Sequence, residues 1–337
     1  MRRRWLVFAI WLLAGLVGCQ SPPPSSPDTQ PTGGAPSGRI RIAMMPKKIG
    51  IEYFTVCRRG AEEAARELGD VDLLYDGPLK DSSEEQSRKL DNWRLQRFNA
   101  ILIACNDPDQ IAPAIRRCRD AGIHVLTYDA DANPDTSGRE FFINQATVDG
   151  IAQALLDEMV KQVGESATVG VVTSSLTAPN QNAWLAAMER YRRQRYPRLR
   201  MLEPRPSEED QTKAIVEAQN IIKTHPDVRG IFGLSSVAFP GVAEAVKQQG
   251  KAGQIAVVGL SNPKTMRPYI EEGVVRSGIL WNVPDLGYLA VYAARAVARG
   301  ELKPGDRTFS AGRLGRLSIG PKGEIVLGRP LIYDASN

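Results

Sequence analysis

From Arg39 onward, short runs of apolar residues alternate with segments whose apolar positions recur at helical spacing. The first run, IRIAMM, precedes a segment in which apolar side chains recur every three or four residues up to Gly69, a residue type that commonly ends helices. The pattern predicts strands at IRIAMM, VDLLY, AILIA and IHVLTYD, with helices between them, including one near residues 83–97. Because these runs are apolar on both faces, we expect a parallel sheet covered by helices on either side.

The same rhythm starts again after FFINQ (141–145). It predicts strands at ATVGVVT, 199–203, RGIFGL, IAVVGL and VVRSGILW, and helices near residues 147–163, 181–195, 209–224, 240–249 and 285–299. Two successive sets of this kind indicate an α/β fold with two doubly wound, parallel-sheet lobes, since right-handed crossovers place helices on both faces of each sheet.

The strand at VVRSGILW and the helix near 285–299 are more elements than a second doubly wound lobe requires. We therefore expect the chain to cross between the lobes more than once. A three-strand hinge is predicted, with crossings near residues 144, 261 and 283. The predicted N-terminal lobe then comprises residues 39–144 plus 262–283, and the C-terminal lobe residues 145–261 plus 284–337.

The first 38 residues lack this pattern. Three arginines precede the apolar run Trp5–Val17, which ends at Gly18; this order is typical of an export signal, and the run is too short to span a bilayer. LVGC, residues 16–19, resembles the lipobox of bacterial lipoproteins, which implies a signal peptide over residues 1–18 and a lipid on Cys19. The alternative is an ordinary secretory signal with an incidental cysteine. Residues 19–38 are rich in Pro, Ser and Gly and predict a disordered tether.

Location and net charge follow from this segment. The protein is expected to be exported, either periplasmic or at the cell surface, and to meet the membrane only through its lipid anchor. Loss of residues 1–18 removes three arginines and no acidic residue, so the formal charge of +5 becomes +2. A nearly balanced charge does not imply a nucleic-acid partner.

Composition also argues against an enzyme, a cofactor or a metal site. The three cysteines after Cys19, at positions 57, 105 and 118, lack CxxC spacing and are expected to be buried hydrophobes, with a Cys105–Cys118 bridge as the alternative. The only histidines, His124 and His225, are expected to be structural. No HExxH, GxGxxG or P-loop motif occurs, and GLSSV (233–237) departs from a nucleophile elbow at its fifth residue. The arginine-rich run 190–200 is interpreted as a solvated helix face, with docking of an acidic partner as the alternative.

In open parallel sheets, ligand groups come from loops at the carboxyl ends of the strands. Here those loops place planar polar groups beside aromatic residues: Asp129 and Asp131; Asn180, Gln181 and Asn182 with Trp184; Trp281 with Asn282; and Tyr53 with Phe54. Carboxylates and amides bind hydroxyl groups, and aromatic faces cover the C–H patches of a sugar ring. This set suits a small uncharged polyol. For each residue taken alone, a role as a helix cap or turn former is the alternative.

Read in order, these loops resemble the periplasmic-binding-protein family of ABC sugar importers, in its pentose and hexose branch. The segments PKKIGIEYF, LLYDGP, NQNAW, MRPYIEEG and LWNVPDLGY look like the subgroup of rhamnose-binding and autoinducer-2-binding proteins, and the tail from Ser310 to Asn337 looks like the rhamnose type. The resemblance implies a type I periplasmic-binding-protein fold and a monomer without cofactor. It also implies a monosaccharide ligand, such as a rhamnose-like deoxyhexose, and an ABC permease as partner.

The resemblance also implies roles for particular residues. Lys47 stands where the family places a polar contact, Tyr53 and Phe54 where aromatic residues wall the sugar, and Asp129 where a carboxylate grips ring hydroxyls. Contacts from the second lobe and the last crossover are implied at Asn180, Gln181, Leu234, Ser236 and Asn282. Autoinducer-2 binders carry Asp where this chain has Asn180, and Pro and Ala where it has Leu234 and Ser236. These departures favour a plain sugar over autoinducer-2.

The expected mechanism is closure of the two lobes around the ligand. Three other functions remain open. One is a sensor that presents autoinducer-2 or a sugar to a signalling receptor. Another is a cytoplasmic repressor core, which would need a DNA-binding domain where this chain has an export signal. The third is an exported hydrolase, which would need catalytic groups that the sequence does not reveal.

Overall fold

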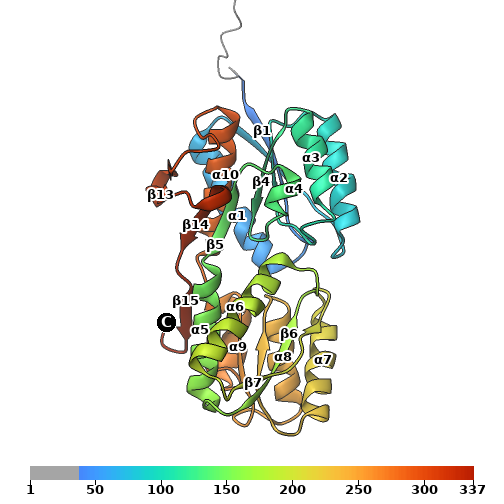
Figure 1. The fold of residues 1–337 in the computed structure, drawn as a ribbon, viewed down its shortest axis with the longest axis vertical. Helices are drawn as coiled ribbons and strands as arrows, with labels where there is room; N and C mark the ends of the chain where they lie inside the picture. The colour runs from blue at the N-terminus through green and yellow to red at the C-terminus, as the bar shows by residue number, and fades with distance from the viewer. Residues whose placement is uncertain (1–37) are drawn as a thin grey trace, which may run out of the picture. The chain divides into compact units, whose positions relative to one another are not determined.

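The computed structural model describes residues 38–337. The predicted signal peptide, the lipidation site at Cys19 and the tether up to residue 37 lie outside the described residues. Across residues 38–337, none of the helices combines the length and apolar content needed to cross a bilayer. The described chain forms two parallel sheets flanked by helices, which confirms the predicted α/β class with two lobes (Figure 1).

The first lobe is built on a six-stranded parallel sheet of order β14-β5-β4-β3-β1-β2. Its strands are β1 (Ile40–Met45), β2 (Val71–Tyr75), β3 (Ala100–Ile103), β4 (His124–Tyr128), β5 (Phe142–Ala146) and β14 (Glu324–Gly328). The helices of this lobe are α1 (Glu52–Leu68), α2 (Ser83–Leu95), α3 (Ala112–Asp120), α4 (Pro134–Ser137) and α10 (Val283–Ala298). All four residues of β3 are buried, as expected for a strand with helices on both faces.

The second lobe is built on the order β10-β9-β6-β7, with β8 also pairing with β6. Its strands are β6 (Thr168–Thr173), β7 (Arg200–Met201), β8 (Arg205–Pro206), β9 (Val228–Gly233) and β10 (Ala256–Gly259). A bridge between Leu260 and Ile279 adds β11 (Ser277–Leu280), which pairs antiparallel with β15 (Leu331–Asp334). The helices of this lobe are α5 (Val148–Val163), α6 (Pro179–Arg195), α7 (Gln211–Thr224), α8 (Ala238–Gln248) and α9 (Pro263–Glu271).

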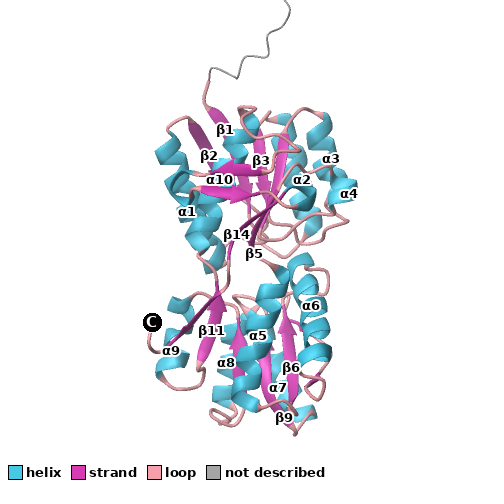
Figure 2. Ribbon diagram, turned by 60° about the vertical axis from the view of Figure 1, so that its left-hand side comes forward, coloured by secondary structure: helices cyan, strands magenta, loops and turns pink. Residues whose placement is uncertain are grey.

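The remaining tail, between α10 and β15, forms a short hairpin of β12 (Thr308–Ser310) and β13 (Arg316–Ser318), with single 3-10 turns at Gly312–Leu314 and Pro321–Gly323. The tail then enters β14, which lies parallel to β5 (Figure 2). None of these tail elements is predicted from the apolar pattern, because they are short and largely exposed.

Two segments lie in the opposite lobes to those expected. Helix α10 packs along α1 so closely that a Cβ on Gly287 would lie 1.9 Å from the Cys57 carbonyl oxygen, and β14 pairs with β5 (Figure 1). Residues 283–328 therefore belong largely to the first lobe, while α9 and β11 pack with the second. Alternation of strands and helices along the chain does not reveal which sheet a strand joins, so the expected assignment of 262–283 and of 284–328 was reversed, whereas β15 lies with the second lobe as expected.

The crossings between the lobes follow from this placement. The chain leaves the first sheet at β5 and enters α5 at residues 146–148, returns between β11 and α10 at 280–283, and crosses again between β14 and β15 at 328–331. Two of these positions lie close to the expected 144 and 283. The expected crossing at 261 was wrong: Leu260 continues the second sheet by bridging to β11.

The three cysteines after Cys19 are fully buried and free, which confirms their interpretation as small buried hydrophobes; the alternative bridge between Cys105 and Cys118 is not formed. Burial raises the pKa of the Cys57 and Cys105 thiols well above the ordinary value, which disfavours their reactive thiolate form.

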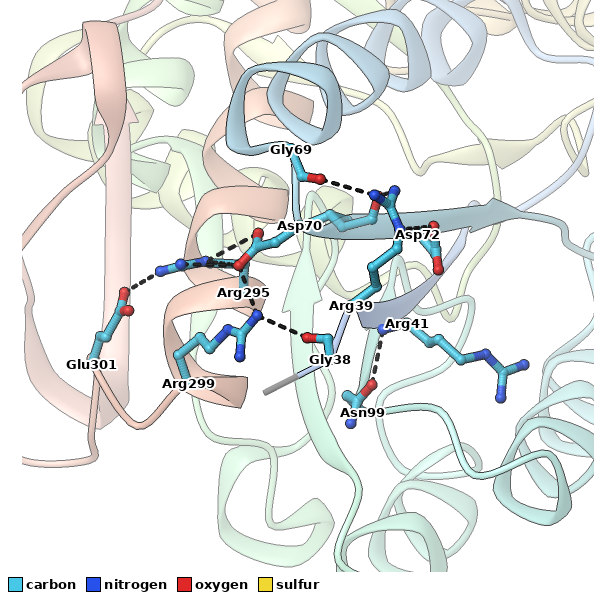
Figure 3. Close-up of polar contacts among 11 residues, drawn as sticks. Gly38, Arg39, Arg41, Gly69, Asp70, Asp72, Asn99, Arg295, Arg299 and Glu301 are labelled. Atoms are coloured by element: carbon cyan, nitrogen blue, oxygen red, sulfur yellow. Dashed lines mark hydrogen bonds and ion pairs between the residues drawn. The ribbon is translucent and has the colours of Figure 1, made fainter. Parts of the chain in front are cut away.

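A cluster of ion pairs fastens the start of β1 to the end of α10 (Figure 3). Arg295 and Arg299 both donate to Asp70, at 3.0 and 2.9 Å, and Arg299 also donates to the Gly38 carbonyl oxygen at 2.9 Å. Burial by itself would raise the pKa of Asp70, but the hydrogen bonds and charges of the two arginines outweigh it and hold the pKa below 3.8. Asp70 thus ties the turn after α1 to a helix more than two hundred residues away in the sequence.

Asp70→Asn should lower the free energy of unfolding by about 1–2 kcal/mol, because it removes the charged partner of two arginines. Since the folded-state pKa is lowered, this contribution is present above the ordinary pKa near 3.8 and is lost as the pH falls further. Denaturant unfolding at pH 7 and at low pH measures both effects.

Asp72→Asn is the matched control, because its pair with Arg39 is more than half exposed on both sides. It should change stability by less than about 0.5 kcal/mol. Equal losses in the two variants would contradict a special role for Asp70.

Candidate functional site

A cavity that holds most of the expected ligand-binding residues lies between the two lobes, at the carboxyl ends of β1, β4, β6 and β9. Eight of the nine side chains expected to bind a ligand line it: Lys47, Tyr53, Phe54, Asp129, Asn180, Gln181, Leu234 and Ser236. The fold therefore brings together residues from both lobes that lie up to 189 positions apart in the sequence (47 to 236).

In the first lobe, Asp129 is the centre of the wall. It follows β4 directly, is only 4% exposed, and has a left-handed backbone with φ of 62° that Asp tolerates better than most residues. The Tyr53 hydroxyl, in the first turn of α1, donates to Asp129 Oδ1 at 2.7 Å, and Trp281 Nε1 donates to that hydroxyl at 3.0 Å. This chain of hydrogen bonds fixes the carboxylate from β4, α1 and the β11–α10 crossover.

In the second lobe, the first turn of α6 supplies Asn180 and Gln181. Gln181 Oε1 accepts from the Ser174 amide at 2.7 Å and also from the Thr173 hydroxyl, so that its oxygen holds the loop after β6. Asn180 reaches across the cavity: its Oδ1 accepts from Lys47 Nζ at 2.9 Å, and its Nδ2 donates to Asp129 at 3.4 Å. The two lobes are thus joined directly through this pair of contacts.

The charges of the cavity are held out of water. Burial raises the pKa of Asp129 above its ordinary value, although the nearby Lys47 ammonium and the Tyr53 hydrogen bond act in the opposite direction. Burial likewise raises the pKa of Tyr53 well above 10, so that its hydroxyl stays protonated and able to donate. Charged groups in such surroundings form strong hydrogen bonds to any polar partner that replaces water.

Four aromatic side chains line the cavity. Tyr53 and Phe54 meet edge to face at 5.0 Å between ring centroids, Trp281 lies 6.0 Å from Tyr53, and Trp184 lies 6.1 Å from Trp281. Aromatic faces cover apolar C–H surface, while carboxylate, amide and ammonium groups such as those in this lining bind hydroxyls. The combination suits a small molecule with one apolar face and several hydroxyl groups.

Asn282 does not join the cavity. Its side chain is exposed and caps α10, with Oδ1 accepting from the Asp285 amide at 3.3 Å. The expectation of a ligand contact at Asn282 is corrected in favour of its alternative, a helix cap, which is a position that Asn prefers. Asp131 and Asn182, also noted in the loops, instead bond to Arg139 and to the Leu176 carbonyl oxygen.

Sequence reasoning missed several lining residues. Trp184 and Trp281 were noted only as neighbours of polar groups, and Ser235, Leu260 and Leu280 not as site residues at all. The most consequential omission is Glu209, which is 5% exposed and lies just before α7. Its sequence context, SEED, looks like an ordinary helix start, and the two-residue strand β8 that positions it is too short to predict.

Groups that could serve other chemistry lie elsewhere. His124 pairs with Glu140 at 3.0 Å, and His225 ends α7. On α6, Arg190 pairs with Asp149 and both Arg192 and Arg193 pair with Glu189, as expected for a solvated helix face. Within residues 38–337, no cluster of three or more histidine, cysteine or acidic side chains is arranged to hold a metal ion.

Comparison with known proteins agrees with this architecture. The D-ribose/D-allose-binding protein of Pseudomonas aeruginosa is 25% identical over 240 residues, 70% of this chain and 75% of that protein. An ABC transporter solute-binding protein from Clostridium phytofermentas with bound L-rhamnose has a TM-score of 0.84 at 26% identity, over 89% of this chain and 97% of that chain. LsrB from Clostridium saccharobutylicum in complex with AI-2 has a TM-score of 0.83 at 23% identity, over 88% and 98% of the two chains. A family model described as a periplasmic binding protein domain matches residues 42–302, so the chain belongs to the periplasmic-binding-protein family.

Proposed function

We propose that the protein captures a small uncharged monosaccharide, such as a rhamnose-like deoxyhexose, between its lobes and delivers it to an ABC permease. The observation that carries this proposal is the cavity itself, where the buried side chains of Lys47 and Asp129 from the first lobe and the partly buried Asn180 from the second share the lining with four aromatic rings. The names of the similar proteins, which bind ribose or allose in one case and L-rhamnose in another, support the ligand class.

Membership of the periplasmic-binding-protein family supports this proposal. The chain is a binding protein rather than an enzyme, and the family implies an exported, periplasmic protein. Our proposal adds an anchor: a lipid on Cys19, followed by a tether that lets the lobes stand off the membrane. The lipobox-like LVGC supports this anchor.

Capture requires that the sugar favour the closed arrangement over the open one, because equal affinity for both would shift nothing. Contacts between the lobes already meet at the cavity: Lys47 and Asp129 of the first lobe hydrogen-bond to Asn180 of the second. A sugar hydroxyl inserted among them would bond to both lobes at once. The ligand would then stabilise closure, and the permease would recognise the closed pair of lobes.

A second candidate is a sensor that presents autoinducer-2 or a sugar to a signalling receptor. The likeness in fold to a protein in complex with AI-2 favours it. Asn180, Leu234 and Ser236 depart from the pattern of autoinducer-2 binders, which is why we rank it second. Capture of a permease, rather than a receptor, by the liganded protein would separate the two.

The ligand class is tested by thermal unfolding of residues 39–337 with L-rhamnose, D-ribose, D-allose and AI-2. A ligand present at about one hundred times its dissociation constant should stabilise the wild type by about 2.7 kcal/mol. Asp129→Asn should abolish this effect while leaving the unliganded protein at least as stable, because burial disfavours the charge that it removes. Asp135→Asn, at an exposed pair with Lys322 outside the cavity, is the control. A normal response of Asp129→Asn would remove Asp129 from the binding site.

Closure is tested by small-angle scattering. Asn180→Ala removes both hydrogen bonds that this residue makes to the first lobe, so we expect a larger radius of gyration without sugar and weaker sugar binding. Asn182→Ala, two residues along the same helix and bonded only within its own loop at Leu176, should match the wild type. If both variants scatter like the wild type with and without sugar, the contacts of Asn180 do not govern closure.

A further inference from the structure

Glu209 places a second carboxylate in the cavity, from the lobe that does not carry Asp129. It lies between β8 and α7, in a loop that the end of β6 holds in place: the Ser207 amide donates to the Thr173 carbonyl oxygen at 2.8 Å, and the Glu208 amide to that of Ser174 at 2.6 Å. From the first lobe, Lys48 Nζ donates to the Glu209 carbonyl oxygen at 2.9 Å. The backbone of Glu209 is thus anchored from both lobes.

The loop adopts an unfavourable backbone in order to bury this side chain. Glu208 and Glu209 have φ values of 53° and 50°, in the left-handed region that residues other than Gly, Asn and Asp rarely occupy. Each such residue costs on the order of 1 kcal/mol or more, and strain of this kind is concentrated at functional sites.

The Glu209 carboxylate is incompletely satisfied. The residue is 5% exposed, and its Oε2 has no hydrogen-bond partner among the described residues. The groups that face it are Lys47 from the loop after β1, Asp81 from the loop after β2, Asp129 after β4 and Ser235 after β9. The pKa of Glu209 is raised to about 7: burial is the largest cause and the charges of Asp81 and Asp129 add to it, while the Lys47 ammonium and a hydrogen bond from Ser235 act in the opposite direction.

We infer that Glu209 is a specificity-determining residue whose free carboxylate oxygen accepts a hydrogen bond from one hydroxyl of the captured sugar. The inference rests on the proposed function and deepens it. A buried acceptor without a partner is costly, so a ligand that brings a donor to this point is favoured. A ligand with a hydrogen or methyl group there leaves the oxygen unsatisfied, and a ligand carboxylate there meets like charge. The site therefore selects a sugar with a hydroxyl at this position and rejects sugar acids.

The test compares wild type, Glu209→Gln, Glu209→Leu and Glu208→Gln by calorimetric titration with the four compounds named above. Glu208→Gln is a matched control: it makes the same charge change in the same strained loop, but its side chain pairs with Lys213 outside the cavity. For whichever compound binds the wild type, Glu209→Leu should weaken affinity by about 10- to 100-fold and Glu209→Gln by less. Glu208→Gln should bind within about twofold of the wild type.

Deoxy derivatives of that compound identify the hydroxyl. One monodeoxy derivative should bind the wild type at least about tenfold more weakly than the parent sugar, yet bind Glu209→Leu as well as the parent does, because the partner of the missing hydroxyl is gone. If every derivative loses the same factor in both proteins, Glu209 contacts no hydroxyl and the inference fails while the sugar-binding function stands. If no compound binds the wild type, both fail.

Titration of Glu209 gives a readout without sugar. Its folded-state pKa of about 7 lies above the ordinary 4.5, so the folded protein keeps a proton that the unfolded chain releases. The stabilisation is complete below about pH 4.5 and is lost as the pH rises through 7. As the pH rises from 5 to 8, the melting temperature of the wild type should therefore decrease relative to that of Glu209→Gln. The melting temperature of Glu208→Gln should change with pH as that of the wild type does. Parallel curves for all three proteins would show that Glu209 is not buried as described, and would overturn the inference.

Discussion

The carboxylate of Asp129 is held almost out of water, and much of the surrounding structure compensates for that burial. A desolvated carboxylate is unfavourable unless donors and opposite charge surround it. Tyr53 supplies a hydroxyl that Trp281 orients, Asn180 supplies an amide from the other lobe, and Lys47 supplies a positive charge. These groups come from both lobes and from a crossover between them, so the full set of donors to Asp129 is assembled when the lobes lie together.

The path of the chain makes such a site possible. Three crossings connect the two sheets, and the last of them lets the tail contribute β14 to the first sheet and pair β15 with β11 in the second lobe. The close packing of α10 on α1 tolerates no side chain at Gly287, which makes α10 a rigid part of the first lobe. Trp281 lies on the crossover between β11 and α10. Its indole N–H donates to the Tyr53 hydroxyl, which in turn donates to Asp129. Movement at that crossover and the hydrogen bonding of the carboxylate are therefore linked.

The second carboxylate gives the cavity a chemical asymmetry. Asp129 is well supplied with donors, whereas Glu209 keeps an oxygen without one in the described part of the chain. A polyol could satisfy both carboxylates from one ring, with its apolar face against Trp184 and Trp281. A binding protein needs only this kind of complementarity, without a nucleophile or a base, which agrees with the family to which the chain belongs.

What the sequence determined by itself is local. The main strands and helices were predicted to within a few residues, since buried parallel strands leave continuous apolar runs and helices a regular spacing; the two lobes followed from the repetition of that rhythm. Ligand contacts at Lys47, Asp129 and Asn180 were predicted from resemblance to a family, and the three side chains line one cavity. Only the tertiary structure decided the rest. Which sheet receives α10, β11 and β14 depends on packing between segments far apart in the sequence. The same is true of two side chains. Asn282 caps a helix through a hydrogen bond within one turn, whereas the Glu209 side chain is buried in the cavity only because the two lobes enclose it.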